Sequence, residues 1–182
     1  KYVGGYAPYG YALHPTIRNK LVIDSEAAAV VRQIFELAIG GKPAREIARQ
    51  LNAENVITPG QYFVARNPGT KKFSRMSDKL RWTPQMIYDR LSKLIYTGAA
   101  VGHVRKITTP LSRKTVAQDK EDWIVVEGAH EAIVSREEFE QAQAAINGQP
   151  KTIHEPRLYP LRSLVRCGVC GRAMNHNKHS FY

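Results

Sequence analysis

The chain has 182 residues, of which 43% are hydrophobic, and its 27 Lys and Arg against 16 Asp and Glu give a formal net charge of +11. This length is enough for one ordinary domain with an appendage or for two small domains, and the hydrophobic content excludes a wholly disordered chain. The apolar runs are too short to span a membrane, and the excess of basic residues predicts a polyanionic partner.

The N-terminal segment is rich in Gly and Tyr, which favours extended structure, and we expect it to lead into a short hairpin that ends at residues 21–23. The sequence begins at Lys1 with neither an initiator Met nor a signal-peptide pattern, so we expect a piece of a longer cytoplasmic protein. Apolar residues then recur at helical spacing over residues 25–39, where Asp24 or Ser25 is suited to the N-cap and two Gly residues end the pattern.

Two further helices are predicted on either side of a basic segment. One begins at Pro43, because proline is favoured in the first helical turn, and ends near residue 52. The other covers residues 84–94, with Thr83 as its N-cap. Residues 62–81 have little to bury and are predicted to form a loop, which holds the basic residues Arg66, Lys71, Lys72, Arg75, Lys79 and Arg81.

The helix predicted over residues 84–94 is amphipathic. On a helical wheel Ile87, Leu91 and Leu94 face the core. The opposite face is polar and consists of Gln85, Asp89 and Ser92, with Tyr88 and Lys93 at its flanks.

The C-terminal half predicts two strands, residues 99–106 and 123–127, and a helix that begins after Ser135 at a capping box. Residues 149–162 contain three Pro without periodicity and are predicted to form a linker. We therefore expect an α+β fold, mainly helical with a small antiparallel sheet, in a domain of residues 1–148 that the linker joins to a small unit of residues 163–182.

Charge is segregated along the chain. Residues 62–114 carry twelve basic and two acidic side chains, whereas residues 115–146 carry two basic and eight acidic side chains. Such segregation is typical of a protein that binds a polyanion, and the acidic segment is expected to face away from that partner.

The helix pair near residues 43–52 and 84–94 indicates a helix-turn-helix-like element whose second helix enters the major groove of double-stranded DNA. The connection between them is much longer than the usual turn. The residues predicted to contact DNA are Arg66, Lys71, Lys72, Arg75, Lys79, Arg81, Thr83, Gln85, Tyr88, Ser92, Lys93, Arg105, Lys106, Arg157 and Arg162.

The two Cys residues of the chain, Cys167 and Cys170, form a C-x-x-C pair that favours a metal half-site in a reducing compartment over a disulfide framework. Tetrahedral zinc requires four ligands, so this pair supplies half of a zinc site. The other half comes either from a second pair outside residues 1–182 or from His176 and His179.

Taken in order, these motifs resemble the large serine recombinases, which include phage integrases and transposon recombinases. The matching residues are Pro8-Tyr9-Gly10-Tyr11, Glu26-Ala27, Ile34-Phe35, Ile47-Ala48, Leu51-Asn52, Thr58-Pro59, Trp82-Thr83, Tyr96-Thr97-Gly98, Gly128 to Ile133, Glu138-Phe139 and Cys167-Gly168-Val169-Cys170-Gly171. The resemblance implies a DNA-binding recombinase domain followed by the start of a zinc ribbon. It also implies that the resolvase-type catalytic domain is absent here, so that this chain by itself is not an enzyme.

The resemblance implies that the whole protein is a dimer on one site and a tetramer in synapsis, whereas the present chain is expected to be monomeric and to bind no membrane. Two alternatives stay open. One is an HNH-like metal-dependent nuclease, suggested by the C-x-x-C-G motif followed by His176 and His179. The other is a helix-turn-helix regulator or an RNA-binding module.

Overall fold

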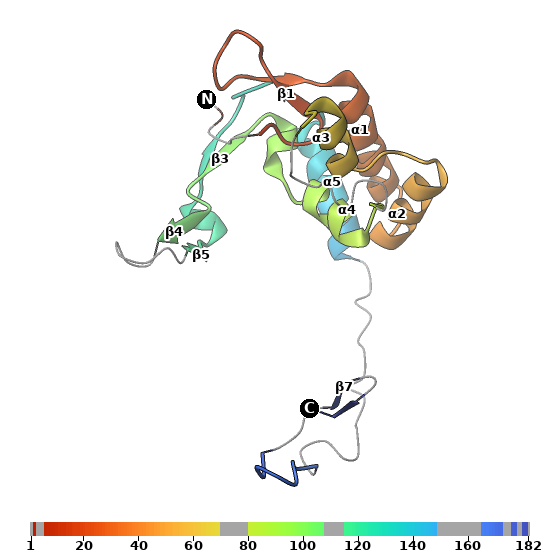
Figure 1. Ribbon diagram of the computed structural model, residues 1–182. Coiled ribbons are helices and arrows are strands. Elements are labelled where there is room, and N and C mark those ends of the chain that lie inside the picture. Colours follow the sequence, from red (N-terminus) through yellow and green to blue (C-terminus); the bar gives the residue numbers. More distant parts are fainter. Residues whose placement is uncertain are drawn as a thin grey trace. The chain divides into compact units, whose positions relative to one another are not determined.

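A computed structural model describes residues 2, 6–69, 80–107, 115–148, 165–172, 176–177 and 180–181 (Figure 1). The chain divides into two compact units, Lys1–Gln149 and Pro150–Tyr182. The described residues form five α-helices and several short antiparallel strand pairs. The expected α+β class is therefore confirmed.

The first unit opens with the predicted hairpin. Strand β1 (Tyr11–Leu13) pairs with strand β2 (Leu21–Ile23) in antiparallel register, with Tyr11 opposite Ile23. Tyr11 is buried, and its hydroxyl donates a hydrogen bond of 2.9 Å to the carbonyl of Glu131, far along the chain. The hairpin is thereby tied to the segment that precedes the last helix of this unit.

Helix α1 (Ser25–Ile39) has the predicted bounds. Its inner face, which includes Val31, Ile34 and Phe35, is fully buried. Asp24 occupies the N-cap position, yet its side chain makes no capping hydrogen bond. Its carboxylate has partners on another helix, which are described below.

Helices α2 (Ala44–Ala53) and α4 (Pro84–Leu91) are the predicted pair, with two corrections. Pro43 lies before α2 in an extended conformation, because its ψ of 150° is outside the helical range. Helix α4 ends at Leu91 rather than at residue 94, since Lys93 is also extended (φ −94°, ψ 111°). A 3₁₀ turn, η2 (Leu94–Thr97), follows and buries the ring of Tyr96.

Helix α3 (Pro59–Arg66) was not predicted, and the interpretation of residues 62–81 as a loop is wrong for residues 62–66. Thr58 and Gln61 form a capping box, in which each side chain bonds the other residue's backbone N–H. This capping box is a local helix signal in the sequence. The prediction of a loop overlooked it, because it relied on the basic composition of residues 62–81.

The core lies among α1, α2, α4 and α5 (Arg136–Asn147), which gather into one bundle (Figure 1). Helix α1 packs on α5, and α2 packs on α4. Ser135 and Glu138 form the predicted capping box at the start of α5. Trp82, which precedes α4, is buried in this core.

The predicted strand of residues 99–106 is interrupted. Strand β3 (Ala100–Gly102) pairs with β6 (Ile124–Val126), whereas β4 (Arg105–Ile107) pairs with β5 (Thr115–Ala117), and both pairs are antiparallel. His103 lies between β3 and β4 with a φ of 59°. A left-handed residue cannot continue a strand, so the chain changes partner there.

A one-turn 3₁₀ helix, η3 (Lys120–Asp122), precedes β6. The second unit contains the antiparallel pair β7 (His176–Asn177) and β8 (Ser180–Phe181). The predicted linker, residues 149–162, lies outside the described residues.

Candidate nucleic-acid interface

Helices α2 and α4 are joined by a side-chain clamp. The Asn52 amide donates a hydrogen bond of 2.9 Å to the Trp82 carbonyl, and its oxygen accepts one of 2.8 Å from the Trp82 backbone N–H. The Trp82 indole donates to the carbonyl of Val56 at 3.0 Å. The end of α2 and the start of α4 are therefore fixed together, although Asn52 and Trp82 are 30 positions apart in the chain.

The start of α4 is set by local chemistry. The Thr83 hydroxyl accepts the backbone N–H of Met86 at 3.3 Å, and Pro84 occupies the first helical position, as predicted. Ile87 and Leu91 are buried against the bundle. Because these two residues fix the rotation of the helix about its axis, the opposite face is left to solvent.

The exposed face of α4 carries several of the predicted DNA contacts. The predicted contacts that are exposed on this helix or beside its ends are Arg81, Thr83, Gln85, Tyr88, Ser92 and Lys93. The Gln85 amide donates a hydrogen bond of 3.0 Å to a carboxylate oxygen of Asp89, one turn further along. Ser92 is the C-cap of the helix rather than part of its outer face, since the helix ends one residue before it.

Lys93 lies where the chain leaves α4. Partial burial lowers the pKa of Lys93 because it disfavours the charged amine, and the positive charge of Arg90 lowers it further, while the carboxylate of Asp89 opposes both effects. Arg90 itself turns inward: its guanidinium lies 5.9 Å from the centroid of the Trp82 ring and donates to the carbonyl of Met86 at 3.0 Å. Arg90 therefore stabilises α4 through contacts with Trp82 and Met86.

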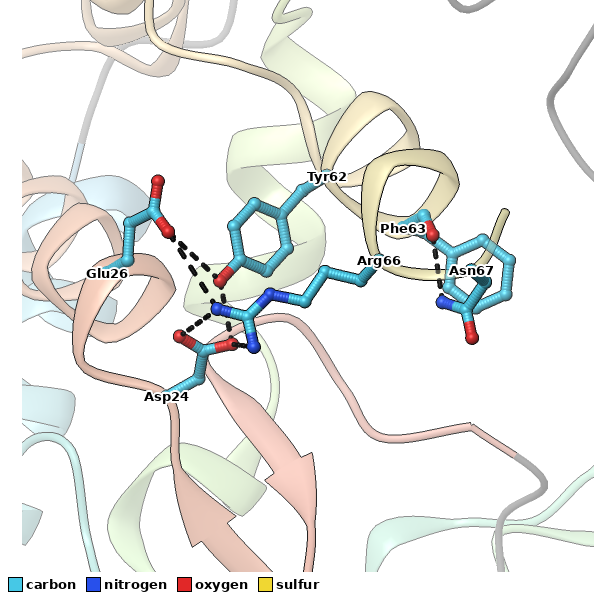
Figure 2. Close-up of polar contacts among 6 residues, drawn as sticks. All are labelled: Asp24, Glu26, Tyr62, Phe63, Arg66 and Asn67. Atoms are coloured by element: carbon cyan, nitrogen blue, oxygen red, sulfur yellow. Dashed lines mark hydrogen bonds and ion pairs between the residues drawn. The ribbon is translucent and has the colours of Figure 1, made fainter.

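Arg66 ends α3 and is engaged by acidic side chains, as Figure 2 shows. Its two terminal nitrogens each lie 3.3 Å from a different oxygen of Asp24, which is a bidentate ion pair, and one of them lies 3.8 Å from Glu26. Its guanidinium also lies 4.9 Å from the centroid of the Tyr62 ring. Arg66 is thus part of an ion-pair cluster on a helix, whereas the sequence predicted a basic loop there.

The carboxylate of Asp24 is almost fully buried, and its second partner is the Tyr62 hydroxyl, which donates a hydrogen bond of 2.7 Å (Figure 2). Burial and this carboxylate together raise the pKa of Tyr62 to about 12. Buried charge is tolerated only when it is paired and hydrogen-bonded, and Tyr62 and Arg66 provide both. The cluster therefore holds α3 against the start of α1.

A cleft of about 390 Å³ lies beside this cluster between β1 and α3. Aromatic side chains line much of it, among them Tyr6 and Phe63, whose rings meet edge to face at 4.9 Å.

Residues 25–149 match the model of the Recombinase family. This match spans more than half of the chain. The chain belongs to the Recombinase family. The resemblance that the sequence motifs carry is thereby confirmed.

Two solved structures are similar to this Recombinase-family chain, each at 19% sequence identity and a TM-score of 0.49. One is described as "Sequence Requirements of the Listeria innocua prophage attP site", and the alignment covers 98% of this chain and 62% of that one. The other is described as "Crystal Structure of a LSR-DNA Complex", with coverage of 100% and 48%. The recombinase chain thus spans less than two thirds of the length of either relative.

The remaining predicted DNA contacts fall into two groups. Arg105 and Lys106 are exposed on β4, and because they are successive residues of a strand, their side chains project to opposite faces. The other predicted DNA contacts lie outside the described residues: Lys71, Lys72, Arg75, Lys79, Arg157 and Arg162.

In the C-terminal unit, Cys167 and Cys170 enclose a tight turn. The Gly171 N–H donates a hydrogen bond of 2.9 Å to the Cys167 carbonyl. The backbone N–H groups of Cys170 and Val169 lower the pKa of the Cys167 thiol, and the Cys170 side chain adds to this effect. Such donors fit a thiolate ligand of zinc. Within the described ranges, no three His, Cys, Asp or Glu residues gather as metal ligands, and His179 lies outside those ranges.

Among the described residues of this recombinase chain, none of the helices has the length and apolar content needed to cross a lipid bilayer.

Proposed function

We propose that this chain is the duplex-DNA-binding part of a large serine recombinase and helps recognise attachment-site DNA during integration and excision. The observation that carries this proposal is the exposed polar face of α4, held against α2 by the clamp between Asn52 and Trp82. Membership of the Recombinase family supports it. The high basic charge of residues 62–114 supports it further.

In this proposal α2 and α4 act as a helix-turn-helix-like pair in which α4 enters the major groove, which is wide enough for one helix. Gln85 lies in the first turn of α4, where a recognition helix meets base edges. Arg81 and Lys93, near the two ends of the helix, bind phosphates and position it without reading sequence.

We also propose a zinc ligand role for Cys167 and Cys170. The N–H groups that favour the Cys167 thiolate support this role. Titration with Co²⁺ tests it, because cobalt–thiolate coordination gives an absorption band in the near ultraviolet. Loss of the band in both Cys167→Ser and Cys170→Ser supports the proposal, and absence of the band in the parent chain overturns it.

A footprint on duplex DNA that contains the parent element's attachment site tests the DNA-binding function directly. The expected result is protection confined to the attachment site, with weaker binding to a scrambled duplex. Stronger binding to single-stranded RNA than to either duplex would instead favour an RNA-binding module. Equal binding to both duplexes would leave the protein a non-specific DNA binder and remove its role in site recognition.

We expect the chain to bind DNA as a monomer and to cut no strand, because the resemblance assigns cleavage to a resolvase-type domain whose motifs this sequence lacks. Incubation of supercoiled DNA with the chain and Mg²⁺, Mn²⁺ or Zn²⁺ checks this expectation. Reproducible nicking that disappears in His176→Ala would favour the nuclease alternative.

A further inference from the structure

An acidic side chain is unexpected on a surface that binds phosphates, and α4 carries one on its outer face. Asp89 follows Gln85 by one helical turn, and Lys93 lies just beyond the end of the helix. The carboxylate of Asp89 accepts the Gln85 amide at 3.0 Å and acts on the charge of Lys93. The Gln85 hydrogen bond and the positive charge of Lys93 therefore both act on the negative charge of Asp89.

The contact between Gln85 and Asp89 fixes which way the Gln85 amide faces. An ionised carboxylate has only acceptor atoms, so the amide nitrogen must turn toward Asp89. The amide oxygen and the second N–H of Gln85 remain available. Without Asp89, the amide could rotate by half a turn and exchange the positions of its donor and acceptor.

We infer that Asp89 is a positioning residue that orients Gln85 to read one adenine in the major groove. Adenine presents an amino donor and the N7 acceptor side by side, which match an amide oxygen and an amide N–H. Guanine presents two acceptors at the same places, so the fixed amide oxygen of Gln85 would face an acceptor. The inference rests on the proposed function, because it requires α4 to lie in the groove.

The test uses the whole 182-residue chain and a library of random duplexes, from which bound sequences are selected and read. The position read by Gln85 is the one whose preference disappears in Gln85→Ala. Affinities are then measured on two duplexes that differ only there, one with A·T and the other with G·C. The parent is expected to prefer adenine by about 5- to 100-fold, the range of one bidentate contact.

Asp89→Asn is expected to reduce this preference by about fivefold or more, because asparagine offers both a donor and an acceptor and permits both orientations of Gln85. Asp89→Ala should have the same effect. Asp89→Glu should restore the parent's preference, since it returns an acceptor-only group. Glu36→Gln, which removes one exposed negative charge from α1, is the matched control and should raise the affinity for both duplexes equally.

Thermal unfolding of each variant separates a loss of reading from a loss of structure, and Asp89→Asn should melt with the parent. If Asp89→Asn and Asp89→Ala keep the parent's preference for adenine, the inference is wrong. Duplex binding by the parent without any base preference also overturns it. No duplex binding by the parent overturns the proposed function itself.

Discussion

Asn52 forms two hydrogen bonds with the backbone of Trp82, one as donor and one as acceptor, in the manner of a neighbouring strand. Helix α3 and residues 67–81 lie between the two residues in the sequence, so the clamp shortens a long connection to a direct contact. It explains how α2 and α4 pack on one another although a long segment connects them.

Asn52→Ala should lower the free energy of unfolding by about 1–3 kcal/mol, because the backbone N–H and carbonyl of buried Trp82 lose their hydrogen-bond partners. It should also weaken duplex binding, since α4 loses its fixed position against α2. Urea denaturation and a duplex titration measure the two effects. Gln50→Ala on the same helix removes only hydrogen bonds at the surface, with Lys42 and Glu54, so it is the control and should change neither by much. Equal effects from both variants would contradict the clamp.

Tyr62→Phe should lower the free energy of unfolding by about 1–3 kcal/mol near neutral pH, because the buried carboxylate of Asp24 loses a hydrogen-bond donor. The raised pKa of Tyr62, about 12 against 10.0, means that the folded state favours the neutral phenol. The stabilisation that the neutral Tyr62 phenol gives the folded state is therefore complete below pH 10, and it is lost as the pH rises toward 12.

The difference in stability between the parent and Tyr62→Phe should therefore shrink over that alkaline range, which chemical denaturation at a series of pH values measures. Tyr88→Phe changes an exposed ring and serves as the control. A difference that stays constant up to pH 12 would argue against the hydrogen bond with Asp24.

Binding to duplex DNA should weaken strongly with salt, because residues 62–114 carry twelve basic and two acidic side chains. If about five or six phosphates are neutralised, log K falls by roughly five for each tenfold rise in salt. Arg81→Ala should reduce this slope by about one while weakening all duplexes alike. Arg136→Ala, in an ion pair with Glu140 at 2.8 Å, should leave the slope unchanged. A slope near zero in the parent would refute the electrostatic interpretation.

Gly98→Ala should destabilise the fold more than Gly41→Ala. Both glycines have a positive φ, 81° and 83°, so each substitution costs about 1–3 kcal/mol in backbone strain. A Cβ at Gly98 would also lie 2.7 Å from the carbonyl oxygen of His130, whereas one at Gly41 would meet nothing within 4 Å. Midpoints of urea denaturation compare the two variants, and equal midpoints would show that the segment around His130 moves freely to accommodate the methyl group.

The sequence alone determined the features whose causes are local. The bounds of α1 follow from apolar spacing and a pair of glycines, and the starts of α4 and α5 follow from the caps at Thr83 and Ser135. Each of these signals acts within a few residues. The buried stripe of α4 left its polar face outside, so the candidate reading residue Gln85 was also accessible to sequence reasoning.

Only the tertiary structure decided which distant residues meet. The partners of Asp24 come from α3, so a residue suited to cap α1 instead binds Tyr62 and Arg66. The same contact converts Arg66 from an expected loop cation into half of a bidentate ion pair. Asn52 likewise finds its partner 30 positions away. Hydrogen bonds and ion pairs of this kind depend on three-dimensional proximity, which the spacing of residues along a chain does not specify.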